Sequence, residues 1–422
     1  MVDLMARDGA ADERDAPIPV TLESVPGGIT APLGFQSAAV SCGIKARSGA
    51  LDLAILAAGE RVAAAGLFTT NLAQAAPVLV SRQHLAHAGG MARAVVVNSG
   101  CANACTGEQG LRDAREMARL TAEAIGCAPE DVLVASTGVI GVALPMHKVA
   151  DGIRRCAAAL SRDAAADTAR AIMTTDPFPK EHAVAATTAG GRFVVGGIAK
   201  GSGMIEPNMA TMLGFLTTDA SVPPILLRRA LRDAARDTFN AITVDGECST
   251  NDSLFALASG SSGVVIDERS YPALLEALRA VSRELAVGIV RGGEGATKVV
   301  AVSVSGARTE EDARRIARTI ANSPLVKTAV HGADPNWGRI VAAAGRAGVT
   351  FDINRTTVHV GGVLLFEHGL PHDDRAPLAA AHLQQSDIRI EVNIGAGGTA
   401  AATIWTCDLS AEYVRINGEY RT

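Results

Sequence analysis

Aromatic residues are scarce in this chain of 422 residues, where Phe, Trp and Tyr together make up 3% of the positions. Hydrophobic residues as a whole still reach 48%, so the interior must be built mainly from small aliphatic side chains. Such a composition favours closely packed layers of sheet and helix. The chain is too long for a typical single core, so we expect two domains or one large layered assembly.

The sequence also lacks a run of basic residues, and its formal net charge is -5. We therefore expect no surface for nucleic acid or for an anionic membrane. It lacks an uninterrupted apolar stretch of about 20 residues, the length that a membrane-spanning helix needs. Residues 1–17 carry Asp, Arg and Ala without an apolar centre, which is not the pattern of a signal peptide. Together these absences predict a soluble, cytoplasmic protein.

Cysteine spacing gives no sign of disulfides or of a metal site. The seven cysteines are scattered and odd in number, which is typical of a reducing compartment. Cys101 and Cys105 lie close together, but no second Cys/His pair at ligand spacing follows them. Gly and Pro between His368 and His372 exclude a helical ligand pair. We expect no metal, with these residues serving as small buried hydrophobes or loop residues.

The order of apolar and polar stretches predicts how the chain is organised. Residues 1–20 are charged and are expected to form a flexible arm. Beyond them, strand-like and amphipathic stretches alternate, which predicts an α/β fold with helices layered outside two packed β-sheets. The early strands are expected at residues 38–44, 51–56, 63–68 and 78–80. The clearest helices are expected at residues 109–125, 147–160, 223–238 and 271–289.

The segment from Lys200 to Ala220 carries the most chemistry. A cation and two glycines open it, a Pro-Asn pair tightens the backbone, and Thr211 then follows the small residue Ala210. A threonine hydroxyl is a weak nucleophile and needs a base. If the chain is cut before Thr211, the freed α-amine has a pKa of about 8 and supplies that base on the same residue. A plain strand residue is the commoner interpretation of such a threonine, and the segment alone leaves both open.

The hydroxyl of Thr211 could also make the cut itself. Its Oγ would attack the carbonyl of Ala210, the acyl group would move from nitrogen to oxygen, and water would release the ester. The small side chain at position 210 and the preceding Gly, Pro and Asn residues would ease that attack. The segment is therefore compatible with a self-cleaving chain, while the plain strand residue stays the commoner interpretation of Thr211.

Several motifs resemble one family. Lys200-Gly-Ser-Gly-Met, Pro207-Asn-Met-Ala-Thr-Met-Leu and Leu216-Thr-Thr-Asp are similar to the cleavage and nucleophile segment of the ornithine acetyltransferases, also called glutamate N-acetyltransferases, of arginine biosynthesis. The resemblance extends from about Gly34 to Thr422. It implies an α chain that ends at residue 210 and carries the oxyanion hole, and a β chain, 211–422, that begins at the nucleophile. The two chains would stay together and form an α2β2 heterotetramer.

The resemblance also implies a ping-pong reaction without a bound cofactor. Thr211 would take the acetyl group from N2-acetylornithine, ornithine would leave, and L-glutamate would accept the acetyl group. Such a split transfer fits a covalent nucleophile that is supported by an oxyanion hole. Acetyl-CoA could serve as another donor and add amino-acid N-acetyltransferase activity, but no motif decides this.

The remaining site residues are carried over from the same family. Thr137 and Gly138 would form the oxyanion hole, since a hydroxyl beside a glycine N–H is a suitable pair of donors. Lys200 would donate to a carboxylate or an acyl oxygen, and Glu294 would receive the ornithine ammonium. Cys101 stands where the family usually has Asn, which leaves its role open. The positions expected to contact substrate are Thr174, Lys200, Thr211, Glu294, Asn417 and Thr422.

Three other interpretations remain at this point. A self-processing amidase or aminopeptidase on a related scaffold would hydrolyse its substrate instead of transferring the acyl group. A non-enzymatic binding protein would stay uncut and inactive. A family member in secondary metabolism would use other acyl donors, which the residues at Cys101 and at His331 to Asp334 keep open.

Overall fold

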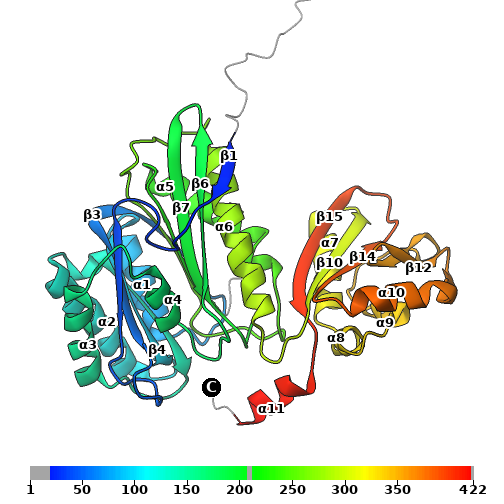
Figure 1. Ribbon diagram of the computed structural model, residues 1–422, viewed down its shortest axis with the longest axis horizontal. Helices are drawn as coiled ribbons and strands as arrows, with labels where there is room; N and C mark the ends of the chain where they lie inside the picture. Colours follow the sequence, from blue (N-terminus) through cyan, green and yellow to red (C-terminus); the bar gives the residue numbers. More distant parts are fainter. Residues whose placement is uncertain (1–19, 207–211, 420–422) are drawn as a thin grey trace, which may run out of the picture.

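The protein is an α/β structure, as the sequence predicts, and its strands form one sheet in each of two units (Figure 1). The computed structural model describes residues 20–206 and 212–419. Most of the expected arm, together with Ala210, Thr211 and Thr422, lies outside these described residues. The larger unit contains the first sheet, and the smaller unit, from residue 299 to residue 407, contains the second. In the part described, no helix is long and apolar enough to cross a membrane.

The first sheet has nine strands in the order β1-β6-β7-β8-β9-β3-β4-β5, with β2 paired to β3. Most neighbours run antiparallel, but β4 pairs parallel to β5 and β8 pairs parallel to β9. The strands are β1 (Thr21–Ser24), β2 (Phe35–Val40), β3 (Leu53–Phe68), β4 (Met91–Cys101), β5 (Val132–Val139), β6 (Lys180–Thr188), β7 (Gly191–Lys200), β8 (Leu213–Thr218) and β9 (Ser253–Ala258).

Strand β3 shows how this one sheet supplies two packed layers. The register shifts midway along the strand, so its first half pairs with β2 and β4 and its second half pairs with β9. Successive side chains of β3 enter different cores: Ile55 packs on one face and Leu56 on the other. The core around Leu56 also contains residues of β7, β8 and β9, among them Ile198, Phe215 and Phe255. That core lies between the two halves of the sheet, which confirms the expected packed layers.

Helices cover the outer face of each half. One core on the outside of β3, β4 and β5 includes residues of α2 (Gly107–Ile125) and α3 (Met146–Ala158), with α1 (Ala76–His87) beside them. On the other outer face lie α5 (Pro224–Arg236) and α6 (Tyr271–Arg291). The short helix α4 (Ala165–Ala171) packs against β2 and adds to the middle core. Short 3-10 turns lie at Pro129–Asp131, Phe239–Ala241, Ile353–Arg355 and Asp373–Arg375.

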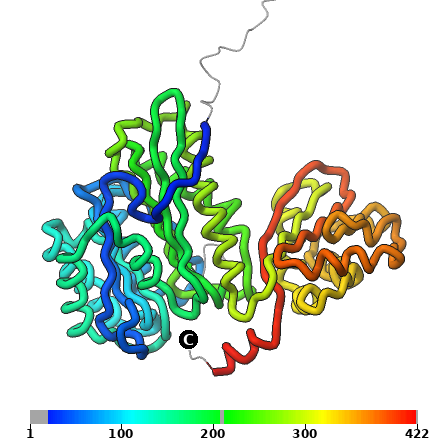
Figure 2. The backbone as a smooth tube through the Cα atoms, in the orientation of Figure 1, coloured from blue at the N-terminus to red at the C-terminus, as the bar shows by residue number. Residues whose placement is uncertain are grey.

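The smaller unit has its own sheet and core. Its strand order is β13-β12-β11-β14-β10-β15, and α7, α9 and α10 supply helix residues to the core. The strands are β10 (Val299–Ala307), β11 (Thr357–Val360), β12 (Val363–Glu367), β13 (Leu370–Pro371), β14 (Asp387–Asn393) and β15 (Ala400–Cys407). The helices are α7 (Glu310–Ala321), α8 (Pro324–His331), α9 (Trp337–Gly345) and α10 (Ala376–Leu383). From β15 the chain continues into α11 (Ala411–Glu419), which returns toward the larger unit (Figure 2).

Two expectations about early strands are wrong. Residues 78–80 belong to α1, because Pro77 lies in the first turn, where its fixed φ favours a helix start. Residues 51–56 and 63–68 do not form separate strands, since 53–68 is one continuous strand. The boundary expected at residues 210 and 211 falls between β7 and β8, which are neighbours in one sheet. An α chain and a β chain divided there would share that sheet.

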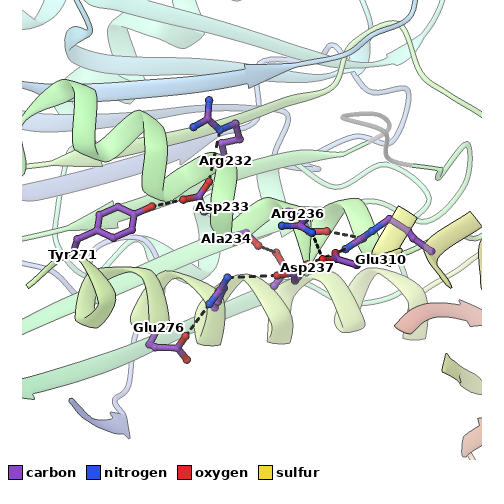
Figure 3. Close-up of polar contacts among 11 residues, drawn as sticks. Arg232, Asp233, Ala234, Arg236, Asp237, Tyr271, Glu276 and Glu310 are labelled. Carbon is purple, nitrogen blue, oxygen red and sulfur yellow. Dashed lines mark hydrogen bonds and ion pairs between the residues drawn. The ribbon is translucent and has the colours of Figure 1, made fainter. Parts of the chain in front are cut away.

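A group of ion pairs joins the two units, and we call it the seam cluster (Figure 3). Asp237, just after α5, lies 2.9 Å from Arg314 of α7 and 3.5 Å from Arg279 of α6. Arg236 of α5 pairs with Glu310 of α7. These side chains are between 22% and 58% exposed. Water and salt therefore screen the pairs, and each contributes little to stability.

Candidate active site

A cavity of about 140 Å³ lies where the ends of β5 and β7 meet the loop after α6 and the C-terminal helix α11. It brings together six residues that the sequence named from widely separated segments. These residues are Thr137, Gly138, Thr174, Lys200, Glu294 and Asn417.

Thr137 and Gly138 lie at the end of β5, where the strand pairs with β4. Gly138 has a φ of 128°, and a Cβ there would lie 2.4 Å from the carbonyl carbon of Gly100. Only glycine fits such a backbone and such a close approach. Asn251 holds the turn, because its Nδ2 donates to the carbonyl oxygen of Ser136 at 2.9 Å. The glycine therefore allows the strand end to bend beside the Thr137 hydroxyl.

Lys200 is the last residue of β7, and it is 7% exposed. Its Nζ donates to Thr174 Oγ1 at 2.9 Å and to Thr137 Oγ1 at 3.3 Å. An ammonium group has three donors, and within residues 20–206 and 212–419 these two bonds use two of them, so the third can serve a ligand in the cavity. Because each hydroxyl accepts from Lys200, its own hydrogen can donate to an oxygen of that ligand. One buried cation thus orients two hydroxyl donors.

A buried ion pair lies behind Lys200. Asp176 Oδ1 accepts from Lys180 Nζ and from Gly201 N, both at 2.7 Å, and Oδ2 accepts from Thr174 N at 3.0 Å. The side chains of Asp176 and Lys180 are 0% and 2% exposed. Burial alone would raise the pKa of Asp176, but the ammonium groups of Lys200 and Lys180 and the hydrogen bonds lower it to about 2. Asp176 is therefore ionised at neutral pH.

Glu294 supplies the acidic side of the cavity. Its backbone N–H donates to Ser202 O at 2.9 Å, and its Oε2 accepts from Asn417 Nδ2 of α11 at 2.8 Å. A Cβ at Gly203 would lie 2.5 Å from the carboxylate, so the glycine lets that group lie directly over the backbone. The cavity therefore has the Lys200 ammonium and the Glu294 carboxylate among its lining groups.

Asp245 joins α11 to the segment that follows β7. Its Oδ2 accepts from Met204 N at 2.6 Å and from the Tyr413 hydroxyl at 3.3 Å, and its Oδ1 accepts from Ile205 N at 2.8 Å. Met204 has a φ of 58°, which is uncommon for a residue other than glycine. Burial first, and then the charge of Asp245, raise the pKa of Tyr413, so its hydroxyl stays protonated as a donor. Asp245 thus braces a strained part of the cavity wall.

Sequence reasoning missed the roles of Asp176 and Lys180. Asp176-Pro177 is an ordinary turn pattern, and Lys180 begins a strand without a motif. The one signal in the sequence was a lysine four residues after an aspartate. Ala210, Thr211 and Thr422 lie outside the described residues, so their positions relative to the cavity stay predictions. Cys101 is buried, its Sγ donates to Val142 O at 3.1 Å, and burial raises the pKa of its thiol.

The chemistry of the cavity suits a small polar molecule. Within residues 20–206 and 212–419, no group of three or more His, Cys, Asp or Glu could hold a metal ion. The cavity instead offers a buried cation, two hydroxyls, a glycine turn and a carboxylate. Donors of this kind can stabilise the oxyanion of acyl transfer, while the carboxylate can receive a cationic group. The fold is that of an α/β protein, and the cavity has the donors that an acyl-transfer site requires.

Comparison with known proteins identifies the family. The ArgJ family model matches residues 36–422. The arginine biosynthesis bifunctional protein ArgJ of Symbiobacterium thermophilum is 50% identical over 405 residues, which cover 95% of this chain and 100% of the relative. The protein of the same name from Dehalococcoides mccartyi is 50% identical over 401 residues, which cover 94% and 98%. Among solved structures, the ornithine acetyltransferase of Mycobacterium tuberculosis, complexed with ornithine, is 40% identical with a TM-score of 0.41, and the match covers 44% of this chain and 99% of that one.

The chain belongs to the ArgJ family. It is an acetyltransferase of arginine biosynthesis that acts on small molecules, as the sequence predicts. Its activity is that of a glutamate N-acetyltransferase, and the curated relatives are named bifunctional.

Proposed function

We propose that the cavity binds N2-acetylornithine and then L-glutamate, and that Thr211 carries the acetyl group between them. The observation that supports this most is the position of Lys200, whose ammonium orients the hydroxyls of Thr137 and Thr174 in the cavity that Glu294 also lines. Both substrates have an α-carboxylate next to an α-nitrogen, which carries the acetyl group in N2-acetylornithine and accepts it in glutamate. One set of donors can therefore serve both half-reactions.

In the first half-reaction, Thr211 Oγ forms a bond to the acetyl carbon, and the bond from that carbon to N2 of ornithine breaks. The α-amine of Thr211 takes the hydroxyl proton and passes it to the leaving nitrogen. The Thr137 hydroxyl and the Gly138 N–H stabilise the oxyanion. In the second half-reaction, the α-amine of glutamate forms a bond to the acetyl carbon, the bond from that carbon to Thr211 Oγ breaks, and the α-amine of Thr211 passes the proton from the glutamate nitrogen to Oγ. No metal or prosthetic group is needed for either step.

Substrate recognition follows from the charges around the cavity. The free ammonium donor of Lys200, with the Thr174 hydroxyl, receives the substrate carboxylate or acyl oxygen. The Glu294 carboxylate receives the side-chain ammonium of ornithine. Asn417 orients this Glu294 carboxylate, because its Nδ2 donates to Glu294 Oε2 at 2.8 Å. We assign Thr422 to the same end of the site from the family resemblance alone. Acetyl-CoA is the donor to Thr211 in the amino-acid N-acetyltransferase reaction.

The proposal includes self-cleavage between Ala210 and Thr211, which gives an α chain, 1–210, and a β chain, 211–422. These chains remain associated as an α2β2 heterotetramer in the cytoplasm. The pairing of β7 with β8, from Val195 with Thr218 to Lys200 with Leu213, supports their association, because the cut leaves a full strand pair between the two chains.

The test is to supply purified protein with N2-acetylornithine, with and without glutamate, and to measure ornithine, N-acetylglutamate and free acetate. We expect ornithine beyond one equivalent per site only when glutamate is present, with equal N-acetylglutamate and no acetate. Continuous release of acetate without glutamate would instead identify a hydrolase.

Lys200→Met tests the role of the site in the same assay. We expect kcat/KM to fall by about a hundredfold or more, the size of effect that follows from losing an oriented donor at a reacting oxygen. Lys148→Met is the matched control, because the Lys148 ammonium bonds to Gly43 O on the exposed surface. Equal activity of both variants would contradict the assignment of the cavity.

A further inference from the structure

The buried pair Asp176–Lys180 contacts the cationic wall of the cavity from behind. Asp176 accepts hydrogen bonds from the backbone of Thr174 and of Gly201, the residue that follows Lys200. Its charge also lies close enough to Lys200 for the two groups to attract each other. With side chains 0% and 2% exposed, the pair itself faces neither solvent nor ligand. It can act on a substrate only through the residues that it holds.

The same pair contacts the segment that carries the acidic wall. The side chain of Lys180 runs along the last turn of α6, where a Cβ at Gly292 would lie 3.2 Å from its Cε and Nζ. The carbonyl oxygen of Gly292 accepts from Ser202 Oγ at 2.6 Å, and Ser202 O accepts from Glu294 N at 2.9 Å. Lys180 is therefore a packed support for the turn that leads to Glu294.

We propose that Asp176 and Lys180 are a positioning pair that fixes the separation between the Lys200–Thr174 wall and the Glu294 carboxylate, and that this separation selects the side-chain length of the N2-acyl diamino acid. The inference rests on the proposed function, in which those two walls bind opposite ends of the substrate. A substrate that is one methylene too long or too short can bind either Lys200 and Thr174 or the Glu294 carboxylate, but not both at once. One methylene is commonly worth about 10- to 200-fold in kcat/KM, so the preference is measurable.

The most direct variant leaves every charge in place. Gly292→Ala adds a methyl group 3.2 Å from Lys180, a contact that requires the lysine or the turn to move by a few tenths of an ångström. Gly288→Ala is the matched control, because Gly288 lies one turn earlier, inside α6, and faces the same lysine at 3.5 Å, an ordinary contact distance.

The measurement is kcat/KM for N2-acetylornithine against N2-acetyl-2,4-diaminobutyrate and N2-acetyl-lysine, which are one methylene shorter and longer. We expect the wild-type preference for ornithine to fall about tenfold in Gly292→Ala and to stay unchanged in Gly288→Ala. The double variant Asp176→Asn/Lys180→Met, which removes both charges of the pair together, should lose the preference as well. If it does not fold, the two glycine variants still decide the question.

The outcomes separate this inference from the proposed function. If the wild type does not transfer acetyl from N2-acetylornithine, the proposed function fails and the inference fails with it. If the wild type is active and prefers ornithine, but Gly292→Ala and the double variant keep that preference, only the positioning role is overturned. A uniform loss of activity on all three substrates also contradicts it, because a purely structural role predicts that result.

Discussion

Two clusters of opposite charges in this chain have similar distances and very different surroundings. Asp176 and Lys180 are 2.7 Å apart with almost no exposure, whereas Asp237 and Arg314 of the seam cluster are 2.9 Å apart with 38% and 22% exposure (Figure 3). From these distances alone, the two ion pairs would be expected to contribute equally to stability. Burial separates them, since charges removed from water depend on their partners while exposed charges are solvated and screened.

The comparison explains where each cluster is used. The seam cluster joins α5, α6 and α7 through side chains that are partly exposed to solvent. The buried pair lies beside Lys200, and its carboxylate also holds two backbone N–H groups of the cavity wall. The pair thereby keeps a third charge, the Lys200 ammonium, buried at a defined position. Charges that position a substrate need such fixed surroundings more than charges that join two surfaces.

The largest expected effect comes from breaking the buried pair on one side only. Asp176→Asn leaves Lys180 buried without its counter-charge, so we expect the free energy of unfolding to fall by about 3–5 kcal/mol. Asp237→Asn in the seam cluster should lower it by less than about 1 kcal/mol. Urea unfolding of the full protein measures both values. Equal losses in the two variants would remove the distinction drawn between the clusters.

The second largest effect is expected in the pH dependence of the free energy of unfolding, to which the buried Asp176 carboxylate contributes. The pKa of Asp176 is lowered from 3.8 to about 2, so its contribution to stability is present above pH 4 and is lost as the pH falls through about 2. This one group should account for roughly 2 kcal/mol of the wild-type loss between about pH 4 and pH 2. Asp176→Asn/Lys180→Met should lose correspondingly less over that interval. Identical pH profiles for the two proteins would show that Asp176 has an ordinary pKa.

The smallest expected effect concerns the seam cluster and salt. Arg314→Met should change the free energy of unfolding by less than about 1 kcal/mol, and the difference from the wild type should shrink as salt rises to about 1 M. Unfolding curves at low and high salt measure this directly. A large loss that salt does not reduce would mean that the seam is effectively buried.

Sequence motifs were enough to name most of the cavity, because Thr137, Thr174, Lys200 and Glu294 lie in short stretches that resemble a known family. The buried pair could not be found in that way, since neither Asp176 nor Lys180 stands in a pattern that differs from a turn or a strand start. Their role depends on burial, and the packing of α6 and α4 against β6 and β7, which contributes to that burial, cannot be read from a local pattern.

The same limit applies to the fold. Alternating apolar residues predicted the α/β layers and the main helices, and these are confirmed. The strand β3 is continuous although Gly59, Glu60 and Arg61 interrupt its apolar pattern, because these three are exposed residues within the strand. Val78 and Val80 favour a strand by their residue type, but the start of α1, with Pro77 in its first turn, places both in a helix.

The most direct test of the central claim is the intact mass of the purified protein, with and without N2-acetylornithine, beside Thr211→Ala. We expect two wild-type chains that meet between Ala210 and Thr211, and a β chain that gains the mass of one acetyl group with the donor and loses it when glutamate is added. The variant should remain one uncut, unacetylated chain. A folded wild-type protein that stays uncut, or a β chain that never carries the acetyl group, would contradict the account.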